Sequence, residues 1–518
     1  MNNRFLLASK EIADRFLQNV IFIDDMADKS ENDSPQAFNP MVVTKFFASK
    51  GKLCTIIAPK NSDEFLNYTQ LLMKADVIVL DWTLIFPQQA SEDLDPEADA
   101  PEEEIHGADT LKVIRTLCTD CQKYKLIIVY TGDVNLEEIN NAIFQTISDI
   151  DGASKGVCEI HLRNTSIFVR AKDDMTHGRF KHLPKFKPFV LSYDMLPEFI
   201  LEKFTQEVYG LIPNFVLNTL ATIRENTSLI LSKLSRDLDS AYMGHRIIQD
   251  NQSDAKLMLT RVFGDALIDL ANTKDRDYQD LVHAWIEECV QEPVLENDKT
   301  LSKDILLKLV DPALTIEDRI TLFGNAGFKG KNLEKYAPRL YTVPERDHEN
   351  ANIEFAKLTH HKNYFRPSSI PPVLSLGTIV LSQNSKKYYV CVQQRCDSVR
   401  IKEGVRNFIF LPLIEKGGEH PILTDDGKTL SVDYKSYNIK VFPFKATHGC
   451  ISAHINENSE YVFIANKGEA DDTDNVEIFR WIVDLKDLHA QRIINTYCAK
   501  VYRVGVDESE WLRAQKKS

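Results

Sequence analysis

Three carboxylates lie at the ends of two apolar segments that have the length and composition of buried strands. Asn19–Asp25 ends on the acidic pair Asp24 and Asp25, and Ala75–Asp81 ends on Asp81. In an open α/β sheet the carboxyl ends of the parallel strands meet at one edge, where the loops leave a crevice for ligands. The three carboxylates are therefore expected at one edge of one sheet.

Two later apolar segments also end on a functional side chain. Lys125–Tyr130 runs directly into Thr131, and Ser166–Ala171 runs directly into Lys172. By the same reasoning, the hydroxyl and the ammonium group are expected at the edge that carries the carboxylates. The sequence thus predicts one site that consists of Asp24, Asp25, Asp81, Thr131 and Lys172.

Clustered carboxylates suit the binding of a cation. Like charges at close range drive one another to protonate unless a cation lies among them, and Mg²⁺ prefers oxygen ligands while keeping several of its waters. Asp24 and Asp25, with Asp81, are the predicted Mg²⁺ ligands. An aspartate beside a divalent cation can attack phosphorus and form an acyl phosphate, and Asp81 is the candidate nucleophile.

Lys172 and Thr131 fit supporting roles in such a reaction. Lys172 can pair with a phosphoryl oxygen on the side opposite the metal, where negative charge accumulates in the transition state. Thr131 can donate its hydroxyl to another phosphoryl oxygen. Because that second contact forms only after phosphorylation, it can draw a loop inward and convert chemistry into a conformational signal.

The elements that must position these groups follow an α/β pattern from about residue 11 to residue 194. Apolar strands alternate with segments of helical periodicity, as in a parallel sheet with crossover helices. Helices are predicted over Gly107–Cys121 and Leu136–Ser148. Strands are predicted over Val20–Asp24, Leu53–Ala58, Val77–Asp81, Leu126–Tyr130 and Ser166–Ala171.

The rest of the chain changes character twice. Residues 196–323 have helical periodicity, and their apolar stripes fit either an internal core or a homodimer interface. A proline-rich break over Arg366–Pro372 precedes short strands, predicted to form a small barrel or sandwich, and a final helical segment. We therefore expect three domains: an α/β domain over 1–195, a helical domain over 196–365, and a β-rich domain with a C-terminal helix over 366–518.

Composition restricts the function classes. A chain of 518 residues exceeds the roughly 250 to 300 residues of a single core. Its net charge of −14 argues against nonspecific nucleic-acid binding, which needs a positive surface. No apolar run approaches the roughly 18 residues of a membrane helix, and the first residues do not resemble a signal peptide, so a cytoplasmic location without membrane contact is expected.

The site residues resemble those of the response-regulator receiver domain. That family has an acidic pair after strand one, a phosphoacceptor Asp after strand three, Ser or Thr after strand four and Lys after strand five. These positions match Asp24 and Asp25, Asp81, Thr131 and Lys172 over roughly the first 195 residues. The resemblance implies a flavodoxin-like, doubly wound fold, a Mg²⁺ cofactor and a sensor histidine kinase as phosphoryl donor.

The sequence departs from the family pattern in three places. The Pro that usually follows the lysine is replaced by Asp173, whereas Lys187 is followed by Pro, which makes Lys187 the second choice. The aromatic switch residue of strand five has no clear counterpart, since Val169 lies near the expected place and Phe168 lies beside it. More residues separate Asp81 from Thr131 in the sequence than in compact receivers, because of an acidic insertion over Ser91–Ile105.

Alternative functions remain open at this point. A degenerate pseudo-receiver would act only as an adaptor. A haloacid-dehalogenase-like phosphatase would use Asp81 as nucleophile, but it needs a second Asp two residues later, where this chain has Thr83. The chain also resembles the receiver components of phage-defence systems of the Detocs type, which implies a response regulator or a phosphate sink rather than an enzyme that acts on other molecules.

Overall fold

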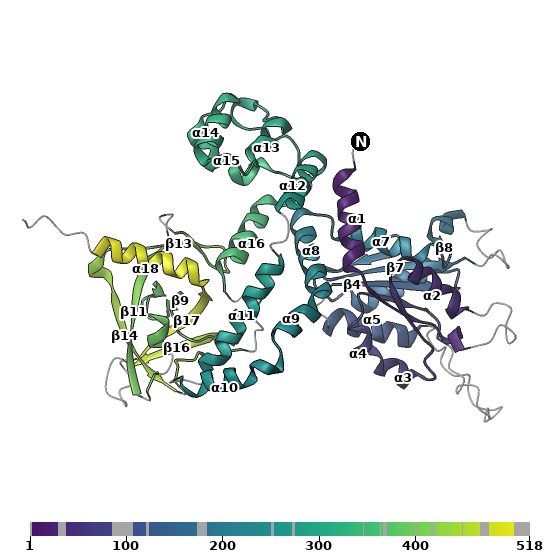
Figure 1. Cartoon of the computed structure of the whole chain (residues 1–518), viewed down its shortest axis with the longest axis horizontal. Helices are drawn as coiled ribbons and strands as arrows, with labels where there is room; N and C mark the ends of the chain where they lie inside the picture. Colours follow the sequence, from purple (N-terminus) through teal and green to yellow (C-terminus); the bar gives the residue numbers. More distant parts are fainter. Residues whose placement is uncertain are drawn as a thin grey trace, which may run out of the picture. The chain divides into compact units, whose positions relative to one another are not determined.

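A computed structural model of the chain shows two compact units, Met1–Val290 and Gln291–Ser518 (Figure 1). The structure describes residues 3–28, 38–84, 107–120, 124–173, 184–249, 253–271, 275–344, 346–362, 364–365, 370–398, 401–402, 404–415, 418, 420–447, 449–466 and 476–501. The predicted acidic insertion over Ser91–Ile105 lies outside these ranges, and the predicted domain boundaries near residues 195 and 365 stay predictions.

The first unit contains an eight-stranded sheet in the order β2-β1-β3-β4-β7-β6-β5, with β8 paired to β7. Its strands are β1 (Asn19–Ile23), β2 (Leu53–Ile57), β3 (Val77–Leu80), β4 (Lys125–Thr131), β5 (Ser154–Gly156), β6 (Glu159–His161), β7 (Thr165–Lys172) and β8 (Val190–Leu191). The pairs among β2, β1, β3, β4 and β7 are all parallel. The five predicted strands are confirmed, and their carboxyl ends share one edge of the sheet.

Helices cover both faces of this sheet. They are α1 (Arg4–Phe16), α2 (Pro40–Ser49), α3 (Ser62–Asn67), α4 (Thr69–Leu72), α5 (Ala108–Asp120), α6 (Leu136–Ile147) and α7 (Leu196–Glu207). Alternate strand residues point to opposite faces: Ile78 and Leu80 pack with α3 to α6, while Val77 and Val79 pack with α1, α2 and α7. Burial on both faces explains why the strands read as continuous apolar runs, and it confirms the doubly wound fold.

Five further helices complete the first unit. They are α8 (Leu211–Glu225), α9 (Thr227–Lys233), α10 (Asp239–Ile247), α11 (Ser253–Ala271) and α12 (Asp275–Cys289). α8 packs on α1, where it buries Leu217 and Ala221. The predicted helical character of this stretch is confirmed.

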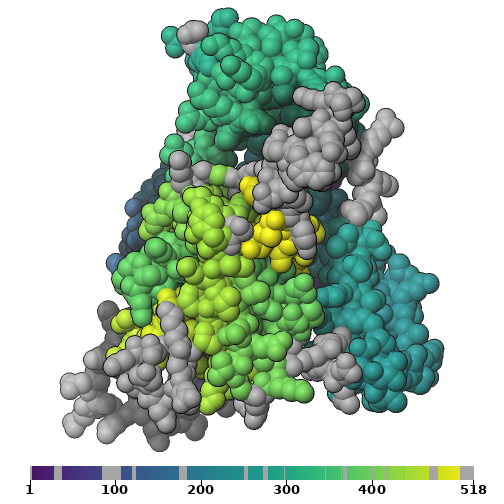
Figure 2. Space-filling view, turned by 90° about the vertical axis from the view of Figure 1, so that its left-hand side faces the viewer, coloured from purple at the N-terminus to yellow at the C-terminus, as the bar shows by residue number. Residues whose placement is uncertain are grey.

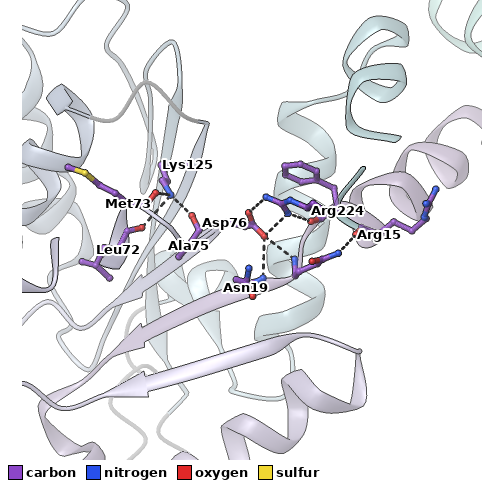
Figure 3. Close-up of polar contacts among 10 residues, drawn as sticks. Arg15, Asn19, Leu72, Met73, Ala75, Asp76, Lys125 and Arg224 are labelled. Carbon is purple, nitrogen blue, oxygen red and sulfur yellow. Dashed lines mark hydrogen bonds and ion pairs between the residues drawn. The ribbon is translucent and has the colours of Figure 1, made fainter. Parts of the chain in front are cut away.

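Asp76, at the amino end of β3, fastens α8 to the sheet edge opposite the predicted site (Figure 3). Its carboxylate accepts the backbone N–H groups of Gln18 at 3.1 Å and Asn19 at 3.2 Å. It also accepts the guanidinium of Arg224 from α8 at 2.9 and 3.1 Å, and this guanidinium stacks on the Phe16 ring at 4.3 Å. The α/β domain and α8 are therefore joined by directed polar contacts as well as by apolar packing.

Lys125 is buried at the same edge (Figure 3). Its ammonium donates to the carbonyl oxygens of Met73 at 2.9 Å and Leu72 at 3.3 Å, and to that of Ala75. These carbonyls lie where α4 ends and β3 is about to begin. Since they satisfy the charge, the lysine has a structural role.

The second unit begins with short helices and continues as a β structure. Its helices are α13 (Lys303–Leu309), α14 (Ile316–Asn325), α15 (Leu333–Leu340), α16 (His348–His360), α17 (Arg395–Ser398) and α18 (Asp487–Val501). Its strands are β9 (Thr378–Ser382), β10 (Tyr388–Cys391), β11 (Gly404–Ile414), β12 (Ile422–Leu423), β13 (Thr429–Val432), β14 (Lys440–Ala446), β15 (His454–Ile455), β16 (Tyr461–Asn466) and β17 (Val476–Asp484).

These strands close into an antiparallel barrel because β10 pairs with both β9 and β11. One cluster of the barrel core is rich in phenylalanine, with Phe408, Phe410, Phe444 and Phe479 all buried. Ile493 of α18 packs in a second cluster with the other face of the strands. Of the two predicted alternatives, barrel or sandwich, the barrel is confirmed.

Candidate functional site

Hydrogen bonds of the sheet ladder hold the ends of β1 and β3 together. The backbone N–H of Asp81 donates to the carbonyl oxygen of Ile23 at 2.9 Å, and that of Asp24 donates to Ile57 at 3.2 Å. The two aspartates therefore leave adjacent strands at the same level. Asp25 follows as the first residue of a 3-10 helix, Asp25–Asp28.

Three carboxylates meet at this edge. Within the part of the chain that the structure describes, Asp24, Asp25 and Asp81 form the one group of acidic, histidine or cysteine side chains whose ligand atoms suit a metal ion, all within 4.8 Å of one another. Asp24 is fully buried and Asp81 is nearly so. The donor set consists of oxygen, which fits a hard cation such as Mg²⁺.

Lys172 lies between two of these carboxylates. Its Nζ atom is 2.7 Å from Oδ2 of Asp24 and 2.5 Å from Oδ2 of Asp81. The Lys172 side chain is only 17% exposed, so both ion pairs lie in a region of low polarity where they are strong. Lys187, the second candidate, is exposed in the 3-10 helix Pro184–Phe189.

The cluster carries more negative than positive charge. The pKa of Asp81 is raised to about 6: burial is the largest cause, the charge of Lys172 opposes it, and the neighbouring Asp24 and Asp25 carboxylates add to the rise. Burial lowers the pKa of Lys172, but Asp81 and Asp24 outweigh this effect and hold it well above its usual range. One ammonium among three carboxylates leaves excess negative charge that a divalent cation can neutralise.

Thr131 lies at the same edge on the next strand. Leu80 pairs with Val129 in the β3–β4 ladder and Thr131 pairs with Ala171 in the β4–β7 ladder, so Thr131 lies one residue before the level of Lys172. The Thr131 side chain is buried, and its hydroxyl oxygen accepts the N–H of Asp133 at 3.0 Å. This hydrogen bond links the hydroxyl of Thr131 to the backbone of the loop that follows β4.

The loop after β3 is held by two contacts that sequence reasoning missed. The hydroxyl of Thr110, in the first turn of α5, donates to the carbonyl oxygens of Asp81 and Trp82, both at 3.2 Å. Gly107 has φ +87°, and a Cβ atom there would lie 2.5 Å from the indole of Trp82. The positive φ and this close approach both require glycine, a signal that only the fold makes readable.

Two tyrosines form an aromatic wall beside Lys172. Tyr130 lies under the ammonium, with its ring centroid 5.9 Å from Nζ, and its hydroxyl donates to the Leu191 carbonyl at 2.6 Å. The Tyr193 ring packs against Tyr130 at 5.3 Å. Burial raises the pKa of the Tyr193 phenol, and the nearby Asp24 and Asp81 carboxylates raise it as well. The aromatic residues next to the lysine therefore come from β4 and from the segment after β8.

The two β7 residues near the expected place of the aromatic switch lie in the apolar clusters of the sheet. Phe168 packs in the cluster on one face of the sheet and Val169 in the cluster on the other. Tyr130 could have been noted in the sequence as the aromatic residue directly before Thr131, whereas nothing local marks Tyr193.

Comparison with known proteins identifies the α/β domain. Residues 16–176, from the end of α1 through β7, match the family model of the response receiver domain, so this part of the chain belongs to the response receiver domain family. Such a domain supports a response-regulator role in a phosphorelay and implies a kinase that phosphorylates it. Neither a curated protein nor a solved structure matches the chain. Within the described ranges, no helix combines the length and apolar character needed to cross a membrane.

Proposed function

We propose that the receiver domain accepts a phosphoryl group on Asp81 from a sensor histidine kinase. The observation that carries the proposal is the meeting of Asp24, Asp25, Asp81 and Lys172, with ligand oxygens within 4.8 Å of one another and the ammonium bonded to two carboxylates. A degenerate receiver has little reason to retain a cluster of repelling carboxylates around a lysine.

The proposed step transfers the group from a phosphohistidine. A carboxylate oxygen of Asp81 forms the new bond to phosphorus as the bond between phosphorus and the imidazole nitrogen breaks. The imidazole keeps the electron pair and takes up a proton from solvent, and Asp81 becomes an acyl phosphate. Asp24, Asp25 and Asp81 would hold the Mg²⁺ ion, which would supply positive charge to offset that of the phosphoryl oxygens.

Lys172 and Thr131 complete the proposed mechanism. The Lys172 ammonium, which donates to Asp81 before the reaction, is placed to donate to a phosphoryl oxygen afterwards. The Thr131 hydroxyl can turn from its contact with the N–H of Asp133 to the new phosphoryl group, which shifts the loop after β4. Catalysis in this proposal is limited to the domain's own phosphorylation and dephosphorylation.

The wider setting of the proposal rests on the composition of the chain and on its resemblance to the receiver components of two-component systems. We propose a cytoplasmic response regulator or phosphate sink in a two-component phosphorelay, with anti-phage defence as its biological context. A homodimer through the helices after the receiver domain is part of the proposal, and nucleic acid is not, since the net charge is −14.

Acyl-phosphate treatment followed by intact mass measurement tests the phosphoacceptor. With Mg²⁺ and acetyl phosphate, the full chain is expected to gain the mass of one phosphoryl group, and Asp81→Asn is expected to gain none because the amide is not a nucleophile. Asp133→Asn is the matched control, since its side-chain oxygen can still accept the Asn135 N–H at 2.9 Å. Absence of uptake by the unsubstituted chain, or equal uptake by Asp81→Asn, would favour a pseudo-receiver.

Mg²⁺ binding is expected to weaken about tenfold for each pH unit below about 6, the pKa to which burial and the like charges raise Asp81. A raised carboxyl pKa means that a proton competes with the metal below that pH and no longer competes above it. Titration calorimetry of the full chain at about pH 5 and about pH 7.5 measures the ratio. Equal affinities at the two pH values would contradict the assignment of Asp81 as a ligand.

A further inference from the structure

α18 packs on the barrel of the second unit through a narrow face. Three of its residues, His489, Ala490 and Ile493, are buried, whereas Leu488 is open to solvent. Part of the helix, coloured yellow, reaches the surface of this unit in Figure 2. A Cβ atom at Gly377, just before β9, would lie 2.8 Å from the Cβ atom of Ala490, so the helix lies directly against the barrel backbone. The docking of α18 therefore depends on few side chains, and one of them is a histidine.

Four histidines come together where α18 begins. His489 stacks on His360, the last residue of α16, with ring centroids 4.4 Å apart and an angle of 18° between the ring planes. The ring of His420, shortly before β12, meets that of His489 edge-on at 6.3 Å. His361 follows His360, and its Nε2 atom lies 2.7 Å from the carbonyl oxygen of Leu423. The buried imidazole of α18 thus lies among imidazoles from two other segments of the second unit.

A proton on the buried nitrogen of His489 would have no acceptor. The side chain is 8% exposed, and its Nε2 atom is buried without a hydrogen-bond partner in the described part of the chain. Burial is the largest cause that lowers the pKa of His489, which falls to about 4. The other causes are groups that carry positive charge when protonated: His360, His420, Arg492 and His361. The docked helix therefore holds the imidazole of His489 in its neutral form at neutral pH.

The charged groups nearest the start of α18 act on other partners. The Asp487 carboxylate accepts the guanidinium of an arginine in α17, and Asp425 lies 3.6 Å from the Nδ1 atom of the histidine that follows α16. Asp484, at the end of β17, acts on a buried cysteine of β10. Lys486 is a further positive charge, which acts on the stacked imidazole of α16. The surroundings of the cluster therefore favour neutral imidazoles.

We propose that protonation of His489 releases α18 from the barrel, so that the histidine cluster is a pH-sensitive latch in the second unit. In the released helix the ring is hydrated, and water takes the place of the missing hydrogen-bond partner. The proton comes from solvent. The latch is independent of phosphoryl transfer, because it contains none of the receiver-domain residues.

The strand before α18 is held separately from the helix. The backbone N–H of Lys486 donates to the carbonyl oxygen of His360 at 2.7 Å, and the N–H of Lys362 donates to the carbonyl oxygen of Asp484 at 2.7 Å. These bonds join the end of β17 to the end of α16 without involving the imidazoles. The helix can therefore leave the barrel while β17 stays in the sheet.

The direction of the pH dependence follows from the lowered pKa of a base. Docking requires neutral His489, so it is strongest above about pH 6.5 and weakens as the pH falls toward about 4. A pKa of about 4 in the docked helix and 6.5 in the released helix makes the docking equilibrium constant fall about 30-fold between about pH 8 and about pH 5. Burial also lowers the pKa of His360, which adds to the change in the same direction.

Hydrogen exchange of the full chain at about pH 8 and about pH 5, without acyl phosphate, tests the latch. Exchange rates are divided by the intrinsic rates at each pH to give protection factors. The protection of α18 is expected to fall about 30-fold at the lower pH. The protection of the barrel strands β10 and β11 is expected to change by less than about threefold, because they stay paired when the helix leaves.

A matched pair of variants assigns the effect to one imidazole. His489→Leu removes the titrating group and keeps a buried apolar side chain that favours helix, so the protection of α18 is expected to differ by less than about threefold between the two pH values. His454→Leu makes the same substitution at an exposed histidine of β15. This control is expected to keep the full fall of about 30-fold.

Three results would overturn the inference. Equal protection of α18 at the two pH values means that no proton acts on its docking. A parallel loss of protection in β10 and β11 means that acid unfolds the barrel instead of releasing one helix. A full fall in His489→Leu means that another group controls the helix. The first two results come from the unsubstituted chain, so the latch can be rejected even if a variant does not fold.

Discussion

Replacing Lys172 by methionine is expected to destabilise the receiver domain by about 3 to 5 kcal/mol at about pH 7.5 in the absence of metal. The substitution removes the ammonium that lies 2.7 Å from Asp24 and 2.5 Å from Asp81, and both carboxylates are buried. Two like charges then share a region of low polarity without a counter-ion. Methionine keeps most of the apolar volume of the lysine stem, so the loss comes mainly from the charge.

The pH dependence of this loss distinguishes electrostatics from packing. Without Lys172, the pKa of a carboxyl group in the cluster rises further above its unfolded value. A group with a raised acidic pKa is least costly when it is protonated, so the variant loses stability as pH rises through that pKa and recovers it as pH falls. The loss is therefore expected to be smaller at about pH 5 than at about pH 7.5, whereas a packing defect would be the same at both.

Hydrogen exchange of β1 and β3 across a urea series measures this effect within the full chain. Lys187→Met is the control, because that lysine is exposed and its substitution is expected to change stability by less than about 0.5 kcal/mol. Phosphoryl uptake by Lys172→Met is also expected to slow by about 100-fold or more, since a donor to the developing charge is lost. A variant as stable and as reactive as the unsubstituted chain would exclude Lys172 from the site.

Replacing Asp24 by asparagine is expected to abolish the stabilisation that Mg²⁺ gives to the receiver domain. A ligand that binds only the folded state stabilises it by about 2.7 kcal/mol at a concentration 100 times its dissociation constant. Asp24 is one of three predicted carboxylate ligands, and an amide oxygen carries no net charge toward the cation.

The metal-free stability of this variant is expected to change little. Asn can still accept the N–H of Met26, a bond of 2.9 Å in the present structure, and Lys172 keeps Asp81 as its partner. Removing one carboxylate also relieves repulsion with Asp81. Thermal unfolding with and without Mg²⁺ is the measurement, and Asp133→Asn is expected to keep the full response to the metal. A normal Mg²⁺ response in Asp24→Asn would remove Asp24 from the ligand set.

The sequence alone determined the α/β fold and the edge at which the site residues gather. Strands buried on both faces must be continuously apolar, so their ends were readable wherever the run stopped on Asp24, Asp81, Thr131 or Lys172. Parallel strands share a direction, so their carboxyl ends had to meet at one edge. The same local signals predicted the helices and the strand-rich character of the second unit.

Tertiary structure decided which groups make contact. Lys172 and Lys187 were both candidates because a dipeptide pattern does not encode distance, and only the β4–β7 pairing brings Lys172 to the carboxylates. Tyr193 and Thr110 reach the site from segments with no distinctive local pattern. Their positions depend on long-range packing, which a single sequence does not reveal.

The helical segment shows the same division between local and long-range information. Periodicity correctly predicted that the stretch containing α8 to α11 is helical, but an apolar stripe has the same pattern whether it faces a core or a partner. Exposure separates the two cases, because it depends on which elements lie opposite each face. Leu217 of α8 is buried against the receiver domain, whereas Leu231 of α9 remains open to solvent. The sequence thus determined that these helices form, and the fold decided which of their apolar residues are left for another surface.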